Sequence, residues 1–374
     1  MAKIISPCDL ECAAEALARG NLVALPTETV YGLGGNALNE DAVKKIFAVK
    51  GRPSTDPLIC HVTDVEKAVA LWDVKADPAA LELAKCLGSA IWPGPLTIVF
   101  KANPSLPNAV TGGSGFVGAR IPRHPVALQL LELVGFPVAA PSANTFGHVS
   151  PTMAEHVLKD LGPKDPSLLI IDGGHCDIGI ESTVVKVNSV ESVEILRRGE
   201  VSLTDVQRAI GDKFAAHITI RDTRARHLTP DVAMDGPGQL LTHYSPSVPS
   251  RLLTPSSLTA DMSIDLRNVV VELSTGSKGV PLSHTVVIDF GGHLQALRPG
   301  CLAYRDLSAK AEVREACFAV FEALRWSETI PSAEVVLFPL ISEWPHAIAD
   351  TELLAAVEDR LFRAASGRIV CIRL

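Results

Sequence analysis

Short apolar runs alternate with capped helical patterns along most of this chain, and this alternation limits the folds open to it. A buried strand is predicted at 21–25, followed by a helix over 39–50 that Asn39 caps. Two further helices are predicted to begin at proline, one from Asp77-Pro78 to Gly88 and one over 125–135. Additional strands are predicted at 96–100, 116–121, 137–140, 168–171, 182–187 and 193–197. Short strands in mixed order between helices are typical of an α/β layer structure with a twisted mixed sheet.

The length of the chain indicates more than one domain. Its 374 residues exceed what one hydrophobic core usually organises. Residues 222–247 have no sustained hydrophobic period and are rich in proline, glycine and polar residues. We therefore predict an α/β domain over 1–221, a long linker over 222–247, and a smaller, Rossmann-like α/β domain over 248–374. Because long ordered loops are usually functional, the linker is predicted to act as a lid.

Composition excludes several classes of protein. With 47% hydrophobic and 20% charged residues the chain is globular, and its net charge of −8 argues against a general nucleic-acid coat. Eight scattered cysteines without a C-x-x-C motif predict reduced core thiols. The N-terminal segment has no apolar core of a signal peptide, and no uncharged run is long enough to span a bilayer. These features predict a cytosolic protein without membrane contact.

The stretch PTETVYGLGGNA, residues 26–37, contains a G-x-G-x-x-A pattern that is also found in dinucleotide-binding turns. A Rossmann turn is rejected here, because the helix cap comes only at Asn39 and the neighbourhood of Lys50 lacks the acid that binds ribose. Two interpretations stay open. The glycines let the segment bend against a ligand beside the hydroxyls and carboxylate of residues 27–31, or they form an ordinary glycine-rich loop.

Cationic side chains stand at two further places. Lys50 and Arg52 follow a predicted helix, where they either complement the helix dipole or clamp a phosphate. Arg120 ends an apolar strand, and a buried arginine needs a partner such as a substrate carboxylate. The loop over 141–152 gathers hydroxyl and amide side chains after another strand, where they either bind a ligand or serve as turn formers.

Seven ordered motifs resemble those of the Sua5/YrdC family of L-threonylcarbamoyladenylate synthases. They are PTETVYGLGGNA, KGRPSTDPLICHV, VGARIPRHP, PSAN, ESTVV, LRRG and HYSP. The resemblance covers roughly residues 10–247, and the length fits the long form with a C-terminal Sua5 domain. It implies a YrdC-like first domain with a basic concavity, and a linker that closes over it. The implied reaction joins L-threonine, bicarbonate and ATP into threonylcarbamoyl-AMP with release of pyrophosphate, so the enzyme is a nucleotidyltransferase.

The resemblance also implies roles for residues of this chain. The threonine-binding residues are Thr29, His61, Arg120, Ala140 and Ser182. The nucleotide-binding residues are Arg52, Asp56, Phe116, Ser142, Asn144, Ser150, Arg198 and His243. Lys50 and Arg52 act catalytically by electrostatics, without a covalent nucleophile. Mg²⁺ accompanies ATP, while no protein metal site and no organic cofactor are implied.

Four positions depart from the family pattern. Asp56 stands where asparagine is usual, Phe116 where threonine is common, Lys186 where aspartate is frequent, and Ser245 where the HYxP segment usually has alanine. An anion near ATP phosphates would repel them, unless it helps to hold Mg²⁺ or turns away.

The implied product passes to a transferase complex that makes t6A at adenosine 37 of tRNA, with at most a weak tRNA contact of the synthase itself. Two alternatives stay open: an RNA-binding module that uses the same basic cavity, and a carbamoyl-adenylate enzyme. The low aromatic content and the missing RNP and KH signatures count against the first.

Overall fold

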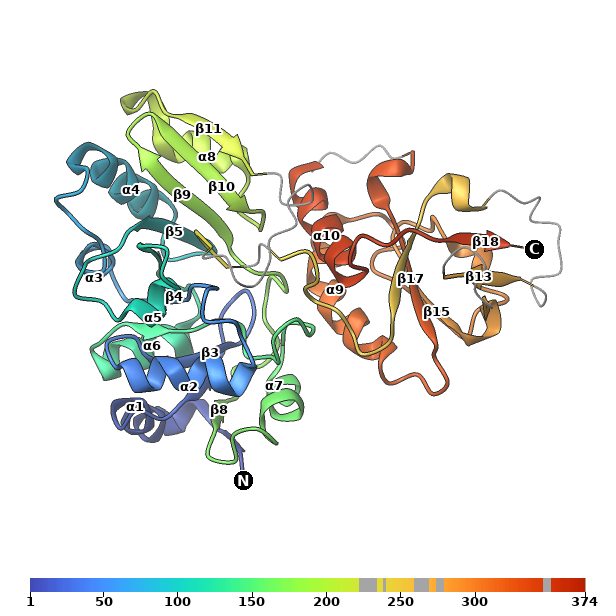
Figure 1. Cartoon of the computed structure of the whole chain (residues 1–374), viewed down its shortest axis with the longest axis horizontal. Coiled ribbons are helices and arrows are strands. Elements are labelled where there is room, and N and C mark those ends of the chain that lie inside the picture. Colours follow the sequence, from blue (N-terminus) through green and yellow to red (C-terminus); the bar gives the residue numbers. More distant parts are fainter. Residues whose placement is uncertain (222–233, 238–239, 259–268, 274–278, 346–350, 374) are drawn as a thin grey trace. The chain divides into compact units, whose positions relative to one another are not determined.

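The computed structural model describes residues 1–221, 234–237, 240–258, 269–273, 279–345 and 351–373. The chain divides into two compact units (Figure 1). The first unit comprises Met1–Phe146 with Ser150–Leu240, and the second comprises Gly147–Val149 with Leu241–Leu374. Of the predicted linker, residues 222–233 and 238–239 lie outside the described residues.

One mixed sheet runs through the first unit, as the sequence predicts. Its described strands follow the order β1-β8-β2-β3-β7-β4-β6-β5-β9-β10-β11. Their bounds are Lys3–Ile5 (β1), Val23–Leu25 (β2), Gly32–Asn36 (β3), Ile59–His61 (β4), Leu96–Lys101 (β5), Phe116–Arg120 (β6), Val138–Ala139 (β7), Leu169–Ile171 (β8), Thr183–Ser189 (β9), Ser192–Arg197 (β10) and His217–Ile220 (β11). The sheet contains parallel pairs, such as β4 with β6, and antiparallel pairs, such as β5 with β6.

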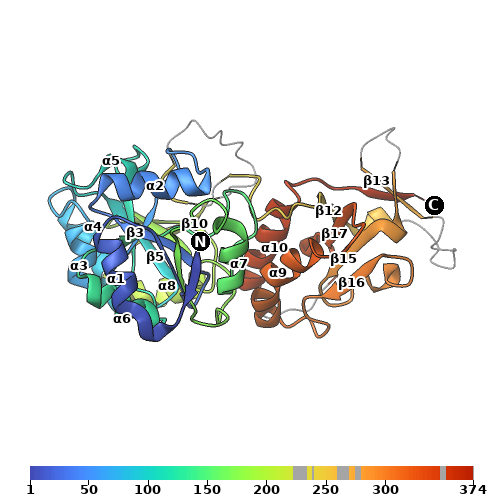
Figure 2. The ribbon, with the colours of Figure 1, turned by 90° about the horizontal axis from the view of Figure 1, so that it is seen from below.

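Helices cover both faces of this sheet. Val23 and Leu25 of β2 pack in one apolar cluster with α1 (Leu10–Ala18) and α6 (Pro125–Val134). Ala24, which points the other way, belongs to a larger cluster on the opposite face. The larger cluster takes in helices that Figures 1 and 2 show around the sheet. They are α2 (Glu40–Lys50), α3 (Val65–Ala70), α4 (Pro78–Ile91), α5 (Asn108–Thr111), α7 (Ala154–Leu161) and α8 (Leu203–Ile210).

Helix capping follows the sequence at most ends. The Asn39 side chain accepts hydrogen bonds from the first turn of α2, and Gly51 ends that helix in the left-handed conformation with φ 66°. The end of α4 differs from prediction. Gly88 does not stop this helix, which continues to Ile91. A Cβ at Gly88 would lie 2.7 Å from the Trp92 ring. The glycine is needed for packing, not for a cap.

The glycine-rich stretch forms a strand and not a bend. β3 pairs antiparallel with β2 and with β7 (Val138–Ala139), so the rejection of a Rossmann turn is confirmed. A Cβ at Gly34 would lie 2.9 Å from side-chain atoms of both Leu25 and Val138. The glycines therefore permit close packing inside the sheet, and neither of the two loop interpretations holds.

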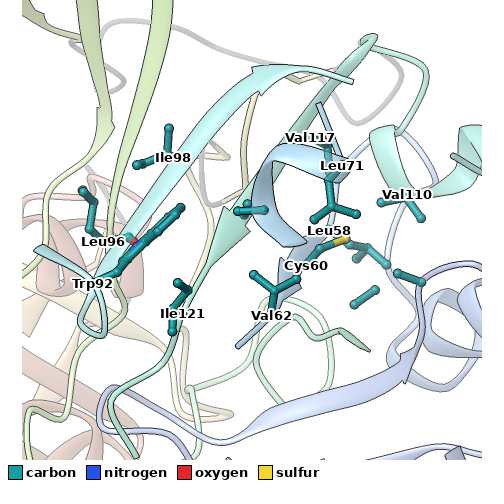
Figure 3. Packing of buried hydrophobic residues seen from close by; sticks show 14 of the residues in the cluster. Leu58, Cys60, Val62, Leu71, Trp92, Leu96, Ile98, Val110, Val117 and Ile121 are labelled. Atoms are coloured by element: carbon teal, nitrogen blue, oxygen red, sulfur yellow. The ribbon is translucent and has the colours of Figure 1, made fainter. Parts of the chain in front are cut away.

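Alternation along β4 sets the direction of the predicted site residue His61. Leu58, Cys60 and Val62 point into the larger apolar cluster, where Figure 3 shows them among other core side chains. His61 alternates with them and therefore points to the other face of β4.

A smaller α/β unit with a parallel four-stranded sheet, consistent with the Rossmann-like prediction, makes up the rest of the chain. The sheet has the order β12-β17-β15-β16, with helices α9 (Val313–Ser327) and α10 (Thr351–Ala364) and a second, three-stranded sheet β14-β13-β18. Its strands are Ser250–Leu253 (β12), Val270–Glu272 (β13), Val280–Pro281 (β14), Thr285–Asp289 (β15), Ala303–Asp306 (β16), Val335–Pro339 (β17) and Cys371–Arg373 (β18).

All eight cysteines are free thiols, but not all of them lie in the core. Cys60, Cys176 and Cys317 are buried, as predicted, whereas Cys8, Cys12 and Cys371 are exposed. The first two lie at the solvent-facing start of the chain, so the prediction of core thiols is wrong there. No helix in the described ranges combines the length and apolarity that a bilayer crossing requires.

Candidate active site

Two predicted threonine-binding residues lie side by side on neighbouring strands. His61 and Arg120 are register partners at the ends of the parallel strands β4 and β6. Side chains at matching positions of such strands point to the same face of the sheet. Arg120 Nη1 donates to Thr29 Oγ1 at 2.9 Å, so a third predicted residue joins them. The structure thus brings Thr29, His61 and Arg120 together from segments far apart in the sequence.

Glu28, which the sequence analysis did not assign to the site, is the ionic partner of Arg120. Glu28 Oε1 lies 2.8 Å from Arg120 Nη2, and the two side chains are 1% and 5% exposed. Burial acts to raise the pKa of Glu28, but the neighbouring guanidinium outweighs it, so the pKa lies below its usual value. The glutamate is therefore held as a carboxylate in the protein interior.

The imidazole of His61 is held neutral. Burial lowers the pKa of His61 to about 3, and the positive charge of Arg120 adds to that shift. Its Nδ1 is buried and has no hydrogen-bond partner among the described residues. A neutral imidazole with a free ring nitrogen suits a hydrogen bond to a substrate hydroxyl.

Ser182, another predicted threonine contact, is fixed from two sides. Its Oγ lies 2.8 Å from Thr97 Oγ1 and accepts from Arg197 Nη2 at 3.1 Å. Arg197 Nε also donates to the Ser182 carbonyl at 3.0 Å. Ala140, predicted on the same grounds, is buried, and its backbone N–H donates to the Ile59 carbonyl.

Lys50 holds the loop that contains the predicted nucleotide-binding residues Ser142 and Asn144. Its Nζ donates to the carbonyl oxygens of these two residues at 2.5 Å and 2.6 Å. Burial lowers the pKa of Lys50 well below its usual value, and the charge of Arg52 acts in the same direction. Lys50 is thus a fully buried amine held by two backbone carbonyls. Neither an interaction with the helix dipole nor an exposed phosphate clamp accounts for this position by itself.

Arg52 is directed by the turn that follows it. Its guanidinium donates to the carbonyls of Asp56 and Pro57, and its Nη2 lies 2.9 Å from Asp56 Oδ1. Both side chains of this ion pair are almost fully buried. Burial raises the pKa of Asp56, and the charges of Arg52 and Lys50 offset only part of that rise. Asp56, which departs from the family pattern, is thus the ionic partner of Arg52.

Replacing Asp56 with asparagine is expected to lower the KM for ATP by about threefold to tenfold, because Arg52 keeps its carbonyl contacts but loses a neutralising carboxylate. The same variant should unfold at a lower temperature, since a buried ion pair is broken. Steady-state kinetics at varied ATP, with the exposed Asp41→Asn as the control, check both results. An unchanged or higher KM would contradict this reading of the pair.

Backbone hydrogen bonds hold the loop over 141–152 against the start of β3. Backbone hydrogen bonds join Tyr31 to Pro151 and to Ala143, and Leu33 to Pro141. Ser150, a predicted nucleotide contact, donates to Glu181 Oε1 at 2.6 Å. The hydroxyls of this loop are thus placed by sheet contacts and not only by local turns.

Two further departures from the family pattern, Phe116 and Lys186, contact each other. Lys186 Nζ lies 3.6 Å from the centroid of the Phe116 ring and 3.1 Å from Asp235 Oδ1. Asp235, from the predicted linker, also pairs with Arg221 at 2.9 Å. The adjacent Met234 N–H donates to the Thr55 carbonyl. These contacts fasten residues 234–235 to the first unit, where Phe116, Lys186 and Asp235 form a matched set, called the linker clasp below.

Two further predicted nucleotide contacts are Arg198 and His243. Arg198 is only partly buried, while its neighbour Arg197 points into the cluster around Ser182. His243 belongs to the second unit, where its ring packs edge-on against the Tyr244 ring, with 4.1 Å between the ring centroids. The nucleotide contacts of Arg198 and His243 stay predictions. No group of three or more His, Cys, Asp and Glu side chains in the described part of the chain could hold a metal ion.

Family models match both parts of the chain. The model for Sua5, YciO and YrdC proteins, described as telomere recombination, matches residues 15–199. The model described as the C-terminal domain of threonylcarbamoyl-AMP synthase matches residues 201–366. The threonylcarbamoyl-AMP synthase of Bacillus subtilis is 34% identical over 96% of this chain and 93% of its own length. The chain belongs to the Sua5/YrdC family. It has the long form of that family, as the sequence predicts.

Other relatives agree with this assignment. The threonylcarbamoyl-AMP synthase of Pyrococcus abyssi is 43% identical over 64% of this chain and 66% of its own length. The match thus covers just under two thirds of that relative. The crystal structure of P. abyssi Sua5 complexed with L-threonine matches with a TM-score of 0.77 and 32% identity, over 99% of this chain and 97% of that one. The fold predicted from the motifs is thereby confirmed.

Proposed function

We propose that this protein synthesises L-threonylcarbamoyl-AMP from L-threonine, bicarbonate and ATP, acting as a nucleotidyltransferase that releases pyrophosphate. The observation that supports this most is the buried group of Thr29, His61 and Arg120. It presents a guanidinium for a carboxylate and a neutral imidazole for a hydroxyl, in a chain whose relatives are named for this product.

The chemistry asks for positioned charge and not for a protein nucleophile. A carbamate oxygen of N-carboxythreonine attacks the α-phosphorus of MgATP, a new P–O bond forms, and the bond to the β-phosphate breaks with its electrons leaving on pyrophosphate. Negative charge grows on the phosphates during this step, and fixed cations stabilise it. Arg52, held by backbone carbonyls, supplies such a cation. The negative charge of bound phosphates would raise the lowered pKa of Lys50, so that its amine, also held by backbone carbonyls, becomes a second cation. Mg²⁺ enters with ATP as part of the substrate.

The product is expected to be consumed by a transferase complex that modifies adenosine 37 of tRNA to t6A. An activated carbamoyl-adenylate is a high-energy acyl donor, so a separate acyl-transfer reaction must use it. Contact of this protein with tRNA itself is expected to be weak, because its net charge is −8.

Pyrophosphate release tests the proposal. The purified protein is incubated with MgATP, with and without L-threonine and bicarbonate, beside its Arg52→Ala variant and the exposed control Arg19→Ala. We expect release only when all three substrates are present, with a loss of about 10²-fold or more in the Arg52 variant and none in the control. Turnover that is indifferent to threonine would favour a carbamoyl-adenylate enzyme. No turnover, together with RNA binding that falls steeply with salt, would favour a binding module.

A further inference from the structure

Several polar atoms around Arg120 could form more hydrogen bonds than they form in the structure. Arg120 Nη2, His61 Nδ1 and both carboxylate oxygens of Glu28 are buried, and none has a hydrogen-bond partner among the residues that the structure describes. Glu28 Oε1 and Arg120 Nη2 form an ion pair at 2.8 Å. Buried polar groups without partners are rare and costly, so a buried set of this kind needs an explanation.

A structural ion pair alone does not explain Glu28. Removing two charges from water costs more than their attraction returns unless further hydrogen bonds satisfy the remaining lone pairs. The backbone N–H groups of Glu28 and Arg123 also act on this carboxyl and lower its pKa, but a carboxylate has about four acceptor sites, so capacity is left for further donors. A ligand that brings N–H donors to Glu28 would supply what is missing.

L-Threonine has three polar groups, and the cluster offers one partner for each. Arg120 is complementary to the carboxylate and His61 to the hydroxyl, as the proposed function has it. The remaining group is the α-ammonium, which donates three hydrogen bonds and carries a positive charge, and Glu28 is the buried anion beside Arg120. We propose that Glu28 binds the α-ammonium group of threonine and then accepts its proton. This inference rests on the proposed function and adds to it a catalytic residue.

The proton transfer makes the amine a nucleophile. The ammonium gives one proton to Glu28, which becomes a neutral carboxylic acid, and the amine nitrogen attacks the carbon of bicarbonate. The new N–C bond forms as the C–OH bond breaks, and the leaving hydroxide takes the second amine proton as water. The carbamate product keeps one N–H, and Glu28 returns its proton to solvent.

Substrate binding prepares Glu28 for this role. In the structure described here the charge of Arg120 holds the pKa of Glu28 down against the opposing effect of burial. The threonine carboxylate would offset part of the charge of Arg120 on Glu28 and so weaken one of the influences that lower its pKa. The other titratable groups that act electrostatically with this pair are His61, His124 and Cys176, with Asp177 acting on the last two.

The test compares two ligands that differ only at the amine. Calorimetry measures binding of L-threonine and of 2,3-dihydroxybutanoate, which carries a hydroxyl in place of the ammonium. We expect Glu28→Gln to weaken L-threonine binding by about 10- to 100-fold and to leave dihydroxybutanoate binding nearly unchanged. Arg120→Ala should weaken both, and the exposed control Glu132→Gln neither. Pyrophosphate release by Glu28→Gln should fall by about 10²- to 10⁴-fold, with the KM for ATP unchanged.

Two outcomes would overturn the inference. In the first, Glu28→Gln weakens both ligands alike, which would mean that Glu28 only positions Arg120; in the second, it leaves threonine binding intact. MgATP binding reports whether the variant folds, and Glu28→Asp, which keeps the charge one methylene further back, replaces it if it does not. If the unmodified protein binds no threonine and releases no pyrophosphate, the proposed function fails and not this step alone.

Discussion

Replacing Arg120 with alanine is expected to lower kcat/KM for L-threonine by about 10²- to 10³-fold, with little change in the KM for ATP. In the proposed complex the guanidinium donates charge-assisted hydrogen bonds to the substrate carboxylate, each worth about 1.5–3 kcal/mol. Initial rates of pyrophosphate release at varied threonine measure the loss. Arg123→Ala is the matched control, because that arginine lies three residues further along the chain and is exposed. A KM for ATP that rose as much as the KM for threonine would contradict the assignment.

The same variant should show a characteristic dependence of stability on pH. Removing one partner of a buried pair costs about 3–5 kcal/mol when the other stays charged. In the unmodified protein the folded-state pKa of Glu28 is depressed, so its contribution is present above the usual value of 4.5 and is lost as the pH falls. Without Arg120, burial raises that pKa instead, and the variant loses stability as the pH rises above 4.5.

Urea-induced unfolding at pH 5 and pH 8 checks this result. The difference in unfolding free energy between the protein and Arg120→Ala should be smaller at pH 5 than at pH 8. A difference that is equal at the two pH values, or larger at pH 5, would show that Glu28 does not respond to Arg120 in this way.

Replacing Lys50 with methionine is the second substitution from which a large effect is expected. Methionine fills a similar volume but cannot donate to the carbonyls of Ser142 and Asn144. We expect kcat/KM for ATP to fall by about 10²-fold or more, because a cation and the placement of the loop are lost together. The KM for threonine should change little, since Arg120 and His61 lie on β6 and β4 and not on the loop that Lys50 holds.

Lys45→Met separates this effect from the loss of any helix lysine. Lys45 lies on the same helix, is exposed, and also donates to a backbone carbonyl, that of Gly20. It should leave all kinetic constants nearly unchanged. If the two variants lost activity to the same extent, or if Lys50→Met affected threonine more than ATP, the role assigned to Lys50 would be wrong.

Local signals in the sequence were sufficient to predict the helices and strands and many of the cationic residues of the site. The Asn39 cap and the Gly51 stop depend on neighbouring residues only, and both are observed. The role of the glycines in β3 could not be predicted, because it depends on the strands that lie on either side, which no local pattern specifies. Glu28 was missed for the same reason, since its partner Arg120 is far away in the sequence.

Arg197 shows another limit. The resemblance assigned a role only to its neighbour Arg198, as a nucleotide contact that stays a prediction, and did not indicate that Arg197 contacts Ser182. Alternation along a strand decides which neighbour points inward, and a register irregularity between Ile195 and Arg197 of β10 resets that alternation. Sequence periodicity alone does not reveal such an irregularity.

The linker clasp has a consequence for the order in which its residues can change. Lys186→Asp alone, which restores the residue frequent in the family, would set two carboxylates against each other at the position of the present Lys186–Asp235 pair and leave Phe116 without its cation. The effect of changing Lys186 thus depends on which residues stand at 116 and 235, a case of epistasis. An evolutionary path back to the usual family residues would have to pass through a change at Asp235 first.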